Sequence, residues 1–362
     1  MPPKNMTVFR ASLLNWYHPH CRNLPWRQSK DPYAIWISEV MLQQTQVKTV
    51  IAYYETFINR FPNLKILAES DLQEVLKVWE GLGYYARARN LHRTAIEISR
   101  RYDGIIPNDW PQIRSLPGIG EYIAAAVLSI AFDQPFAVVD GNVKRVLARI
   151  FKMPQIINKS AFHKVFQTKA DTLIDKRQPG TFNQAMMELG ALICTPRHPD
   201  CHRCPVSLDC GAFASQKVTE YPKCGKKNTP PLHHIAIGVV RKNNRILITR
   251  RKKEGLLGGL WEFPGGKIKP KEMSAVALKR EIKEETSINV KNLTFLTRVK
   301  HAYTHFKIEA DVFLCDHRKG TVRLKGPIDY RWIEPFEIKN YPFPKANHKF
   351  IPLLLQRLES EK

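Results

Sequence analysis

The sequence predicts a multidomain protein in which an all-α region is followed by a smaller α+β region. Through residues 1–213 apolar residues recur at three- and four-residue spacing, which is the period of amphipathic helices. From residue 233 to residue 362 they alternate with polar residues in short runs, as in half-buried strands. Residues 214–232 are rich in Lys and Pro and have no periodicity, which is typical of a linker. A chain of 362 residues has the length for two such domains.

The overall charge indicates a polyanionic partner. The chain has 57 Lys and Arg against 33 Asp and Glu, a formal net charge of +24. This excess favours nucleic acid, although a basic protein without such a partner has the same composition. No apolar run reaches the roughly 18 residues that span a bilayer, and residues 1–10 lack the apolar core of a signal peptide. We therefore expect a cytoplasmic protein with no membrane partner, in a compartment where disulfides are rare.

The first strongly periodic segment runs from Asp31 to Ile51. Asp followed by Pro is a helix-start signal, because Asp accepts the free N–H groups of the first turn and Pro is tolerated there. We expect one amphipathic helix here. Its apolar face consists of Trp36, Ile37, Val40, Met41, Val47 and Ile51, and its other face carries Glu39, Leu42, Gln43 and Gln46. On such a face a Glu is normally a solvated charge.

A cysteine cluster follows near the end of the helical region. Its members, in the spacing C-x6-C-x2-C-x5-C, are Cys194, Cys201, Cys204 and Cys210. In a reducing compartment this pattern indicates a metal centre, because thiolates bind soft metals. Zinc and a 4Fe-4S cluster both accept four thiolates, so the spacing alone leaves both open, with ordinary buried thiols as a third interpretation. The isolated Cys21, Cys224 and Cys315 are expected to be structural.

A short turn sequence, Leu116-Pro117-Gly118-Ile119-Gly120, separates two helix-like stretches. Gly118 and Gly120 permit a tight turn, and the N–H groups of the next helix can then hold a phosphate. By itself the pattern also fits a plain helix connector. Asp140 follows two β-branched residues and precedes Gly141, which is not the context of a solvated helix face.

The cysteine spacing and the glycine turn together resemble the endonuclease III superfamily of helix-hairpin-helix DNA glycosylases. The resemblance implies that the four clustered cysteines hold one 4Fe-4S cluster, which fixes a basic loop against the DNA backbone. It also implies that Gly118 and Gly120 form the DNA-binding hairpin and that Asp140 is catalytic.

Glycosidic chemistry requires a second carboxyl group. Cleavage of an N-glycosidic bond needs an acid that protonates the departing base and a carboxylate that stabilises the oxocarbenium-like sugar. The acid must keep its proton near neutral pH, which burial achieves by raising its pKa. Glu39 is the candidate for the acid, because of the residues around it.

Three strings carry a closer resemblance: Leu24-Pro25-Trp26-Arg27, the segment from Trp36 to Val47, and Gly81-Leu82-Gly83-Tyr84-Tyr85. They resemble the adenine DNA glycosylases of the MutY family over nearly the whole chain. This implies that Glu39 protonates adenine N7 and later activates water. It implies that Asp140 stabilises the sugar cation, by its charge or as a transient covalent adduct, and that Tyr122 and Asn142 support it. Further residues implied are Arg22, Trp26, Arg27 and Gln184 around adenine, and Gln44 and Tyr84 as wedges in the duplex.

One position departs from the bifunctional relatives. These carry a Lys two residues after the second Gly of the hairpin, where its amine forms a Schiff base and permits strand cutting. Tyr122 stands there in this chain. We therefore predict base removal without efficient strand cleavage.

The C-terminal region has an α+β pattern with a Nudix-like motif. Strands are expected from His233 and around residues 246–249, 295–299 and 308–314, with a helix over residues 272–286. Residues 266–288 follow the Nudix box, with Ser287 where Gly is usual. Glu281, Glu284 and Glu285 share one helix face, which suits Mg2+ or, alternatively, is a solvated face paired with neighbouring lysines.

The resemblance implies that this Nudix-like domain recognises 8-oxoguanine. Tyr303, Thr304 and His305 resemble the family's recognition loop, where Phe-Ser-His is the usual pattern. Thr304 keeps the hydroxyl group that can hydrogen-bond the modified base.

Taken together, the sequence predicts a monomeric enzyme of base excision repair, associated with the bacterial nucleoid. It would remove adenine from double-stranded DNA containing A:8-oxoG or A:G mispairs and leave an abasic site. One alternative is a Nudix nucleotide hydrolase with a DNA-binding appendage. The other is a non-enzymatic iron–sulfur protein that binds DNA and does not need Glu39 with Asp140.

Overall fold

The computed structural model describes residues 3, 5–225 and 229–361 of the chain. It divides into two compact units. Unit 1 comprises Met1–Glu69 and Arg93–Lys227, and unit 2 comprises Ser70–His92 and Asn228–Lys362. The linker expected over residues 214–232 includes residues 226–228, which lie outside the described residues. In the described ranges, no helix is both long enough and apolar enough to cross a membrane.

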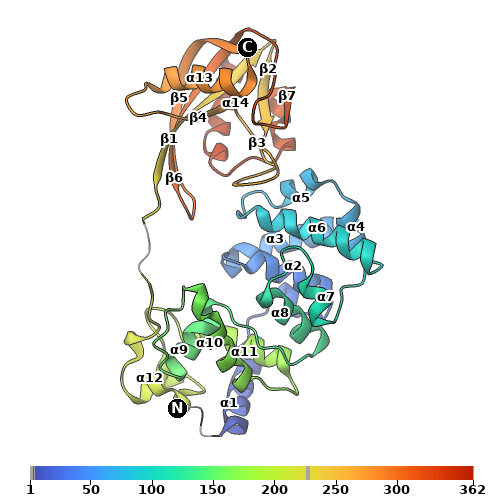
Figure 1. The fold of residues 1–362 in the computed structure, drawn as a ribbon, viewed down its shortest axis with the longest axis vertical. Helices are drawn as coiled ribbons and strands as arrows, with labels where there is room; N and C mark the ends of the chain where they lie inside the picture. Colours follow the sequence, from blue (N-terminus) through green and yellow to red (C-terminus); the bar gives the residue numbers. More distant parts are fainter. Residues whose placement is uncertain (1–2, 4, 226–228, 362) are drawn as a thin grey trace. The chain divides into compact units, whose positions relative to one another are not determined.

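Unit 1 consists of helices joined by short turns (Figure 1). Its helices are α1 (Met6–His20), α2 (Pro32–Leu42), α3 (Val47–Arg60), α4 (Leu64–Glu69), the later part of α6 (Ala86–Arg101), α7 (Trp110–Arg114), α8 (Glu121–Phe132), α9 (Gly141–Ile150), α10 (His163–Leu173), α11 (Pro179–Leu192) and α12 (Gly211–Ala214). Short 3-10 turns are η1 (Pro25–Arg27), η2 (Ser160–Phe162), η3 (Cys201–Arg203), η4 (Ser207–Asp209) and η5 (Val218–Glu220). The prediction of an all-α region is confirmed.

The segment from Asp31 to Ile51 forms two helices, so the prediction of a single helix is wrong. Between α2 and α3 the chain turns through Gln44, whose φ of 57° is left-handed. Every residue from Tyr33 to Met41 is buried, because α2 lies inside unit 1. Glu39 is 4% exposed, so it does not lie on a solvated face, and its burial agrees with its interpretation as a buried acid.

Two glycines let α11 approach its neighbours closely. A Cβ on Gly180 would lie 2.5 Å from the carbonyl oxygen of Ser129 at α8. A Cβ on Gly190 would lie 2.7 Å from the Cβ of Asn142 at α9. Any side chain at either position would force the backbones apart. The close approach brings the inner face of α11 to the start of α9, where Asp140 lies.

Unit 2 contains a seven-stranded mixed sheet. The strands are β1 (Leu232–Lys242), β2 (Arg245–Arg250), β3 (Trp261–Glu262), β4 (Gly265–Lys267), β5 (Asn289–Ala302), β6 (Lys307–Lys319) and β7 (Asp329–Ile333). The main path runs β3-β2-β1-β6-β5, and β4 and β7 pair with β1 and β2. β1 and β6 are parallel, and the other pairs are antiparallel. The β1–β2 turn places Asn243 and Asn244 at φ of 49° and 60°, which suits a tight hairpin.

Two helices cover opposite faces of this sheet. On one face, Leu278 and Ile282 of α13 (Ser274–Thr286) pack with Ala236 and Val240 of β1. On the other face, α14 (Ile351–Ser360) packs with the alternate β1 residues, including Val239. Two short 3-10 turns, η6 (Pro335–Asn340) and η7 (Asn347–Lys349), precede α14. The period-two pattern read from the sequence thus corresponds to a sheet buried on both faces, and the α+β prediction is confirmed.

A helical segment that is distant in sequence completes unit 2. This segment, residues 70–92, comprises α5 (Leu72–Val78) and the first turns of α6. The indole N–H of Trp261 donates to the side-chain oxygen of Gln73 at 2.9 Å, and the side-chain nitrogen of Gln73 donates to the Gly259 carbonyl at 3.0 Å. Glu80 accepts from the backbone N–H of Phe343 at 2.6 Å. Hydrogen bonds of Gln73 and Glu80 therefore hold the segment against β3 and the loop that contains Phe343.

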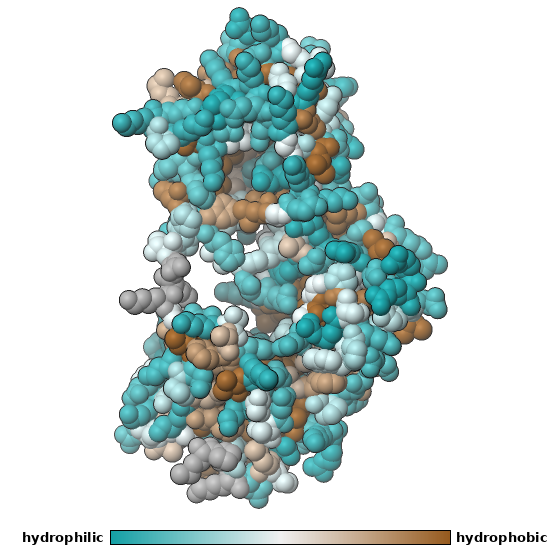
Figure 2. Space-filling model, viewed as in Figure 1, coloured by the Kyte–Doolittle hydropathy of each residue, from teal (hydrophilic) through white to brown (hydrophobic). Residues whose placement is uncertain are grey.

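The face of the molecule drawn in Figure 2 is mainly hydrophilic. Apolar side chains are scattered among its hydrophilic residues. Isolated exposed apolar residues such as Leu208, at 96% exposure, are normal on a soluble surface.

Candidate active site

Glu39 is a buried carboxyl group on α2 that has one neutral hydrogen-bond donor. The hydroxyl of Tyr122, in the first turn of α8, donates to Oε2 of Glu39 at 2.5 Å. Burial raises the pKa of Glu39 to about 7, and the nearby Asp140 acts in the same direction. The Tyr122 hydrogen bond and the charge of Arg27 lower it by smaller amounts. Glu39 can therefore hold a proton at neutral pH.

Asp140 is the second carboxyl group, and it is placed by the start of α9. As the N-cap residue it accepts the N–H of Val143 at 2.7 Å, and Asn142 donates to its other oxygen at 2.9 Å. Burial raises the pKa of Asp140, while these two donors and the charge of Arg145 act in the opposite direction. Two neighbouring carboxyl groups resist ionising together. Asp140 has the better anion-stabilising partners, so Asp140 carries the negative charge and Glu39 the proton.

The extended segment before α9 holds Asp140 in place. Asn183 of α11 accepts the backbone N–H of Val138 at 3.0 Å and donates to the carbonyl of Phe136 at 2.8 Å. Behind the site, Arg145 donates to the Asn142 side-chain oxygen at 2.9 Å and to the Cys194 carbonyl at 2.7 Å. Asp140 is thus supported from α11 and from the cysteine loop.

The residues expected around adenine all belong to unit 1. Arg22 follows α1, and Trp26 and Arg27 lie in η1. The hydroxyl of Tyr17 donates to Oε1 of Gln184 on α11 at 2.9 Å. Trp26 is buried and contacts Tyr54 edge to face, with 5.4 Å between ring centroids.

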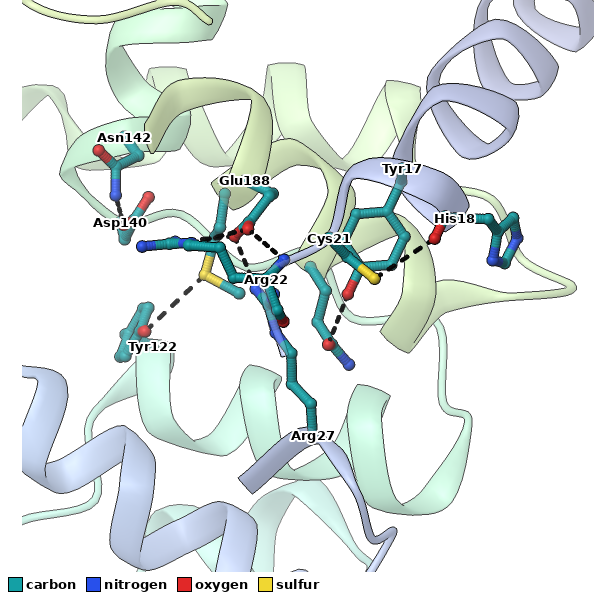
Figure 3. Close-up of polar contacts among 11 residues, drawn as sticks. Tyr17, His18, Cys21, Arg22, Arg27, Tyr122, Asp140, Asn142 and Glu188 are labelled. Atoms are coloured by element: carbon teal, nitrogen blue, oxygen red, sulfur yellow. Dashed lines mark hydrogen bonds and ion pairs between the residues drawn. The ribbon is translucent and has the colours of Figure 1, made fainter. Parts of the chain in front are cut away.

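Glu188, which was not predicted from the sequence, binds both Arg22 and Arg27. The Glu188 carboxylate on α11 accepts from Nε of Arg22 at 2.7 Å and from Nη2 of Arg27 at 2.9 Å (Figure 3). Its side chain is 0% exposed. Burial acts to raise the pKa of Glu188, but the arginine hydrogen bonds outweigh it and lower the pKa to about 2. The only signal in the sequence was its position one helical turn after Gln184, on the same face.

The hairpin turn between α7 and α8 has the expected backbone geometry. Gly118 has φ of 74°, a left-handed conformation that favours glycine. Gly120 is the N-cap of α8, and a Cβ there would meet nothing within 4 Å. Gly120 and Glu121, where α8 begins, are therefore exposed. Gln44, one of the expected wedge residues, is exposed at the turn between α2 and α3.

The four clustered cysteines line one small pocket. Cys194, Cys201, Cys204 and Cys210 face it together with apolar residues that include Ile193 and Phe213. Nη1 of Arg149 donates to Sγ of Cys194 at 3.2 Å. Among the described residues, no three or more His, Cys, Asp or Glu side chains are arranged to hold a single metal ion. The four cysteines that the spacing grouped together therefore line the same pocket.

Family models and curated relatives match most of this chain. Residues 37–170 match the family model of the HhH-GPD superfamily of base excision DNA repair proteins, and residues 236–353 match the NUDIX domain. The adenine DNA glycosylase of Buchnera aphidicola is 37% identical over 303 residues, which cover 83% of this chain and 84% of the relative. The human adenine DNA glycosylase is 36% identical over 385 residues, which cover 91% of this chain and 70% of the human protein.

The chain belongs to the adenine DNA glycosylase family.

A solved structure supports the fold of the helical part of this adenine DNA glycosylase. A thermostable thymine-DNA glycosylase is similar with a TM-score of 0.54 and 31% identity, over 58% of this chain and 97% of the other. The predicted helix-hairpin-helix glycosylase fold, followed by a Nudix-like domain, is therefore confirmed.

Unit 2 of the adenine DNA glycosylase brings two further expected residues together. The hydroxyl groups of Tyr84 and Thr304 lie 2.5 Å apart and share a hydrogen bond. Thr304 and His305 are exposed in the turn between β5 and β6, and Tyr84 has a left-handed φ of 50°. Tyr303 stacks on Phe306 with 4.6 Å between ring centroids, which closes the turn.

The acidic residues of the Nudix box are bound to protein groups. Arg280 pairs with Glu281 at 2.6 Å and with Glu284 at 3.3 Å, and it also pairs with Glu272 at 2.8 Å. Glu285 accepts the backbone N–H of Gly265 at 3.2 Å. Burial raises the pKa of Glu285 to about 7. The helix face expected to suit Mg2+ thus has an arginine among its carboxylates.

Proposed function

We propose that this enzyme hydrolyses the N-glycosidic bond of adenine mispaired with 8-oxoguanine, and with guanine, in double-stranded DNA. The observation that carries the proposal is the pairing of a buried Glu39, with a pKa of about 7, and a hydrogen-bonded Asp140 anion. Acid-assisted departure of a base from deoxyribose needs one neutral carboxyl group and one charged one. A protein that only binds DNA has no use for this combination.

Glu39 delivers its proton to N7 of the extruded adenine, which makes the base a better leaving group. Asp140 then stabilises the positive charge on the sugar, and Asn142 holds the carboxylate through its amide group. After the base has left, Glu39 is ionised and accepts a proton from the attacking water. Tyr122 stabilises that anion through its hydrogen bond.

The adenine has to leave the base stack to reach this site. Gln44 and Tyr84, both in turns with a left-handed φ, are the side chains that we propose enter the duplex. Gly118 and Gly120 would hold the phosphate backbone through the N–H groups that begin α8. Arg22, Trp26, Arg27 and Gln184 would contact the extruded adenine.

The β5–β6 turn is proposed to recognise the opposite base. Thr304 and His305 are exposed there, and the Thr304 hydroxyl is a donor and an acceptor. Thr304 shares a hydrogen bond with Tyr84, so contact between Thr304 and 8-oxoguanine would also affect the position of Tyr84. The enzyme would act as a monomer in the cytoplasm, on the DNA of the nucleoid.

We propose that Cys194, Cys201, Cys204 and Cys210 hold one 4Fe-4S cluster. The four sulfurs line one pocket, as the four thiolate ligands of such a cluster would. The cluster would supply structure, by cross-linking the loop that carries the exposed Arg203 beside the DNA-binding face. Iron and sulfide analysis of protein purified without oxygen tests this, and a Cys204→Ser variant should contain less iron.

The Nudix-like domain is proposed to recognise DNA and not to hydrolyse nucleotides, because Arg280 engages Glu281 and Glu284. A pyrophosphatase assay with 8-oxo-dGTP and Mg2+ tests this. We expect no phosphate release, and hydrolysis would restore the alternative of a Nudix hydrolase.

The proposed activity is tested by single-turnover incubation with duplexes that differ in one base pair, followed by alkali to cut abasic sites. We expect cleavage at A:8-oxoG and A:G, and none at A:T or C:8-oxoG. Equal release of adenine from A:T, or no release from A:8-oxoG, would contradict the proposal.

A further inference from the structure

Glu188 is a fully buried carboxylate that the proposed chemistry does not use. It receives the Nε and Nη2 groups of Arg22 at 2.7 and 2.8 Å, the Arg22 backbone N–H at 2.9 Å, and Nη2 of Arg27 at 2.9 Å. All four contacts come from the segment that follows α1. A buried carboxylate is costly unless it is paired and hydrogen-bonded, and Glu188 is both.

The two arginines are less buried than the carboxylate between them. The side chain of Arg22 is 34% exposed and that of Arg27 is 15% exposed, against 0% for Glu188. Both have further donor groups that Glu188 does not occupy, although Nη1 of Arg27 also donates to the Arg22 carbonyl at 3.2 Å. Glu188 therefore fixes the direction of both guanidinium groups and leaves them able to contact a ligand.

One of these arginines, Arg27, also acts on the proposed general acid through its charge. Arg27 lowers the pKa of Glu39, whereas burial and the charge of Asp140 raise it. The other group facing Glu39 is Tyr122, whose hydrogen bond lowers its pKa. An unpaired guanidinium in this position would lower the pKa of Glu39 further and remove its proton at neutral pH.

We propose that Glu188 is a positioning residue that holds Arg22 and Arg27 at the adenine pocket and neutralises their charge, so that Glu39 keeps its proton. The proposal rests on the proposed adenine excision and adds an electrostatic requirement to it. Glu188 neutralises one of the two arginine charges, so one net positive charge remains near the base. Removing the Glu188 charge would raise this to two.

The test is the pH profile of single-turnover adenine release from an A:8-oxoG duplex, measured between about pH 5 and pH 9. The rate of the natural enzyme should fall as the pH rises through the pKa of Glu39, about 7. Glu188→Gln keeps the shape of the side chain and removes its charge. The falling limb of its pH profile, the range in which the rate drops as the pH rises, should therefore move to lower pH by on the order of one pH unit.

Three further variants separate the charge of Glu188 from its shape. Glu188→Asp keeps the charge, so it should lower the rate with the limb unmoved. The double variant Glu188→Gln with Arg22→Gln restores the charge balance, so its limb should return toward that of the natural enzyme. Glu97→Gln is the matched control, because Glu97 also pairs with two arginines, Arg100 and Arg101, each at 3.3 Å, but on the surface of α6.

A Glu188→Gln enzyme that is slower at every pH with an unmoved limb would overturn the proposal and leave adenine excision intact. A double variant whose limb stays with that of Glu188→Gln would also overturn it. If Glu188→Gln does not fold, Arg22→Gln can be used in its place. This variant removes a positive charge, so the pH at which the rate falls should move to a higher value. A natural enzyme that releases no adenine contradicts the proposed function instead.

Discussion

Tyr122 and Glu39 come from different helices and meet through one hydrogen bond, with the tyrosine hydroxyl donating to the carboxyl oxygen at 2.5 Å. Tyr122 lies in the first turn of α8, directly after the glycine hairpin, and Glu39 lies in the buried stretch of α2. The hydrogen bond stabilises ionised Glu39, while burial disfavours it. Burial has the larger effect on the pKa of Glu39, so Glu39 can hold the proton that base departure requires.

Removing that hydroxyl should raise the pKa of Glu39, because the Tyr122 hydrogen bond lowers it. In Tyr122→Phe the falling limb of the pH profile should therefore move to higher pH, with a loss of rate of about 5- to 10-fold at the optimum. The control is Tyr17→Phe, which removes a hydroxyl bonded to Gln184 at 2.9 Å and should leave the limb in place. A limb that moves downward in Tyr122→Phe would contradict this assignment.

Asp140→Asn should separate activity from folding. Asn caps a helix about as well as Asp, so the free energy of unfolding should change by less than about 0.5 kcal/mol. Adenine release should fall by about 100- to 1000-fold, because the negative charge beside the sugar is lost. Asp109→Asn makes the same change at the N-cap of α7 and should keep full activity. Thermal unfolding and single-turnover rates measure the two effects, and equal losses in both enzymes would argue against a catalytic Asp140.

The absence of a lysine at position 122 should limit the enzyme to base removal. Borohydride should trap no covalent complex with DNA containing an abasic site, since no amine stands at Tyr122. A Tyr122→Lys variant places an amine there and should form the trapped complex. Rapid trapping by the natural enzyme would refute the prediction.

The contact between Tyr84 and Thr304 should contribute to the choice of mispair. Thr304→Ala removes the shared hydrogen bond and one donor for the opposite base. We expect the preference for A:8-oxoG over A:G to fall by about 5- to 10-fold. Thr304→Ser keeps the hydroxyl and should keep the preference. If Ala and Ser variants discriminate alike, the hydroxyl is not the group that recognises 8-oxoguanine.

Local patterns predicted those parts of the molecule that depend on local chemistry. The cysteine spacing, the hairpin glycines and the alternation along β1 each correspond to a feature of the structure, because each is fixed by residues that are near in sequence. The candidate acid at Glu39 came from its sequence context and not from periodicity. The periodicity itself placed Glu39 on a solvated face, which is wrong because α2 is buried on all sides.

The features that the sequence did not predict depend on tertiary contacts. Glu188 has the appearance of an ordinary solvated helix residue until α11 packs against the segment after α1, which supplies its two arginines. Likewise, nothing near residues 70–92 indicates that they pack with the sheet of unit 2. Their partners, such as Phe343 and Thr304, are more than two hundred residues away.

The central claim is that Glu39 is the proton donor in adenine release. It is tested most directly by comparing natural enzyme and Glu39→Gln in a single-turnover assay on an A:8-oxoG duplex, with free adenine measured by chromatography. Gln fills the same space but has no acidic proton, so the account predicts a loss of at least about 1000-fold, with DNA binding retained. Adenine release by Glu39→Gln at the rate of the natural enzyme would contradict it.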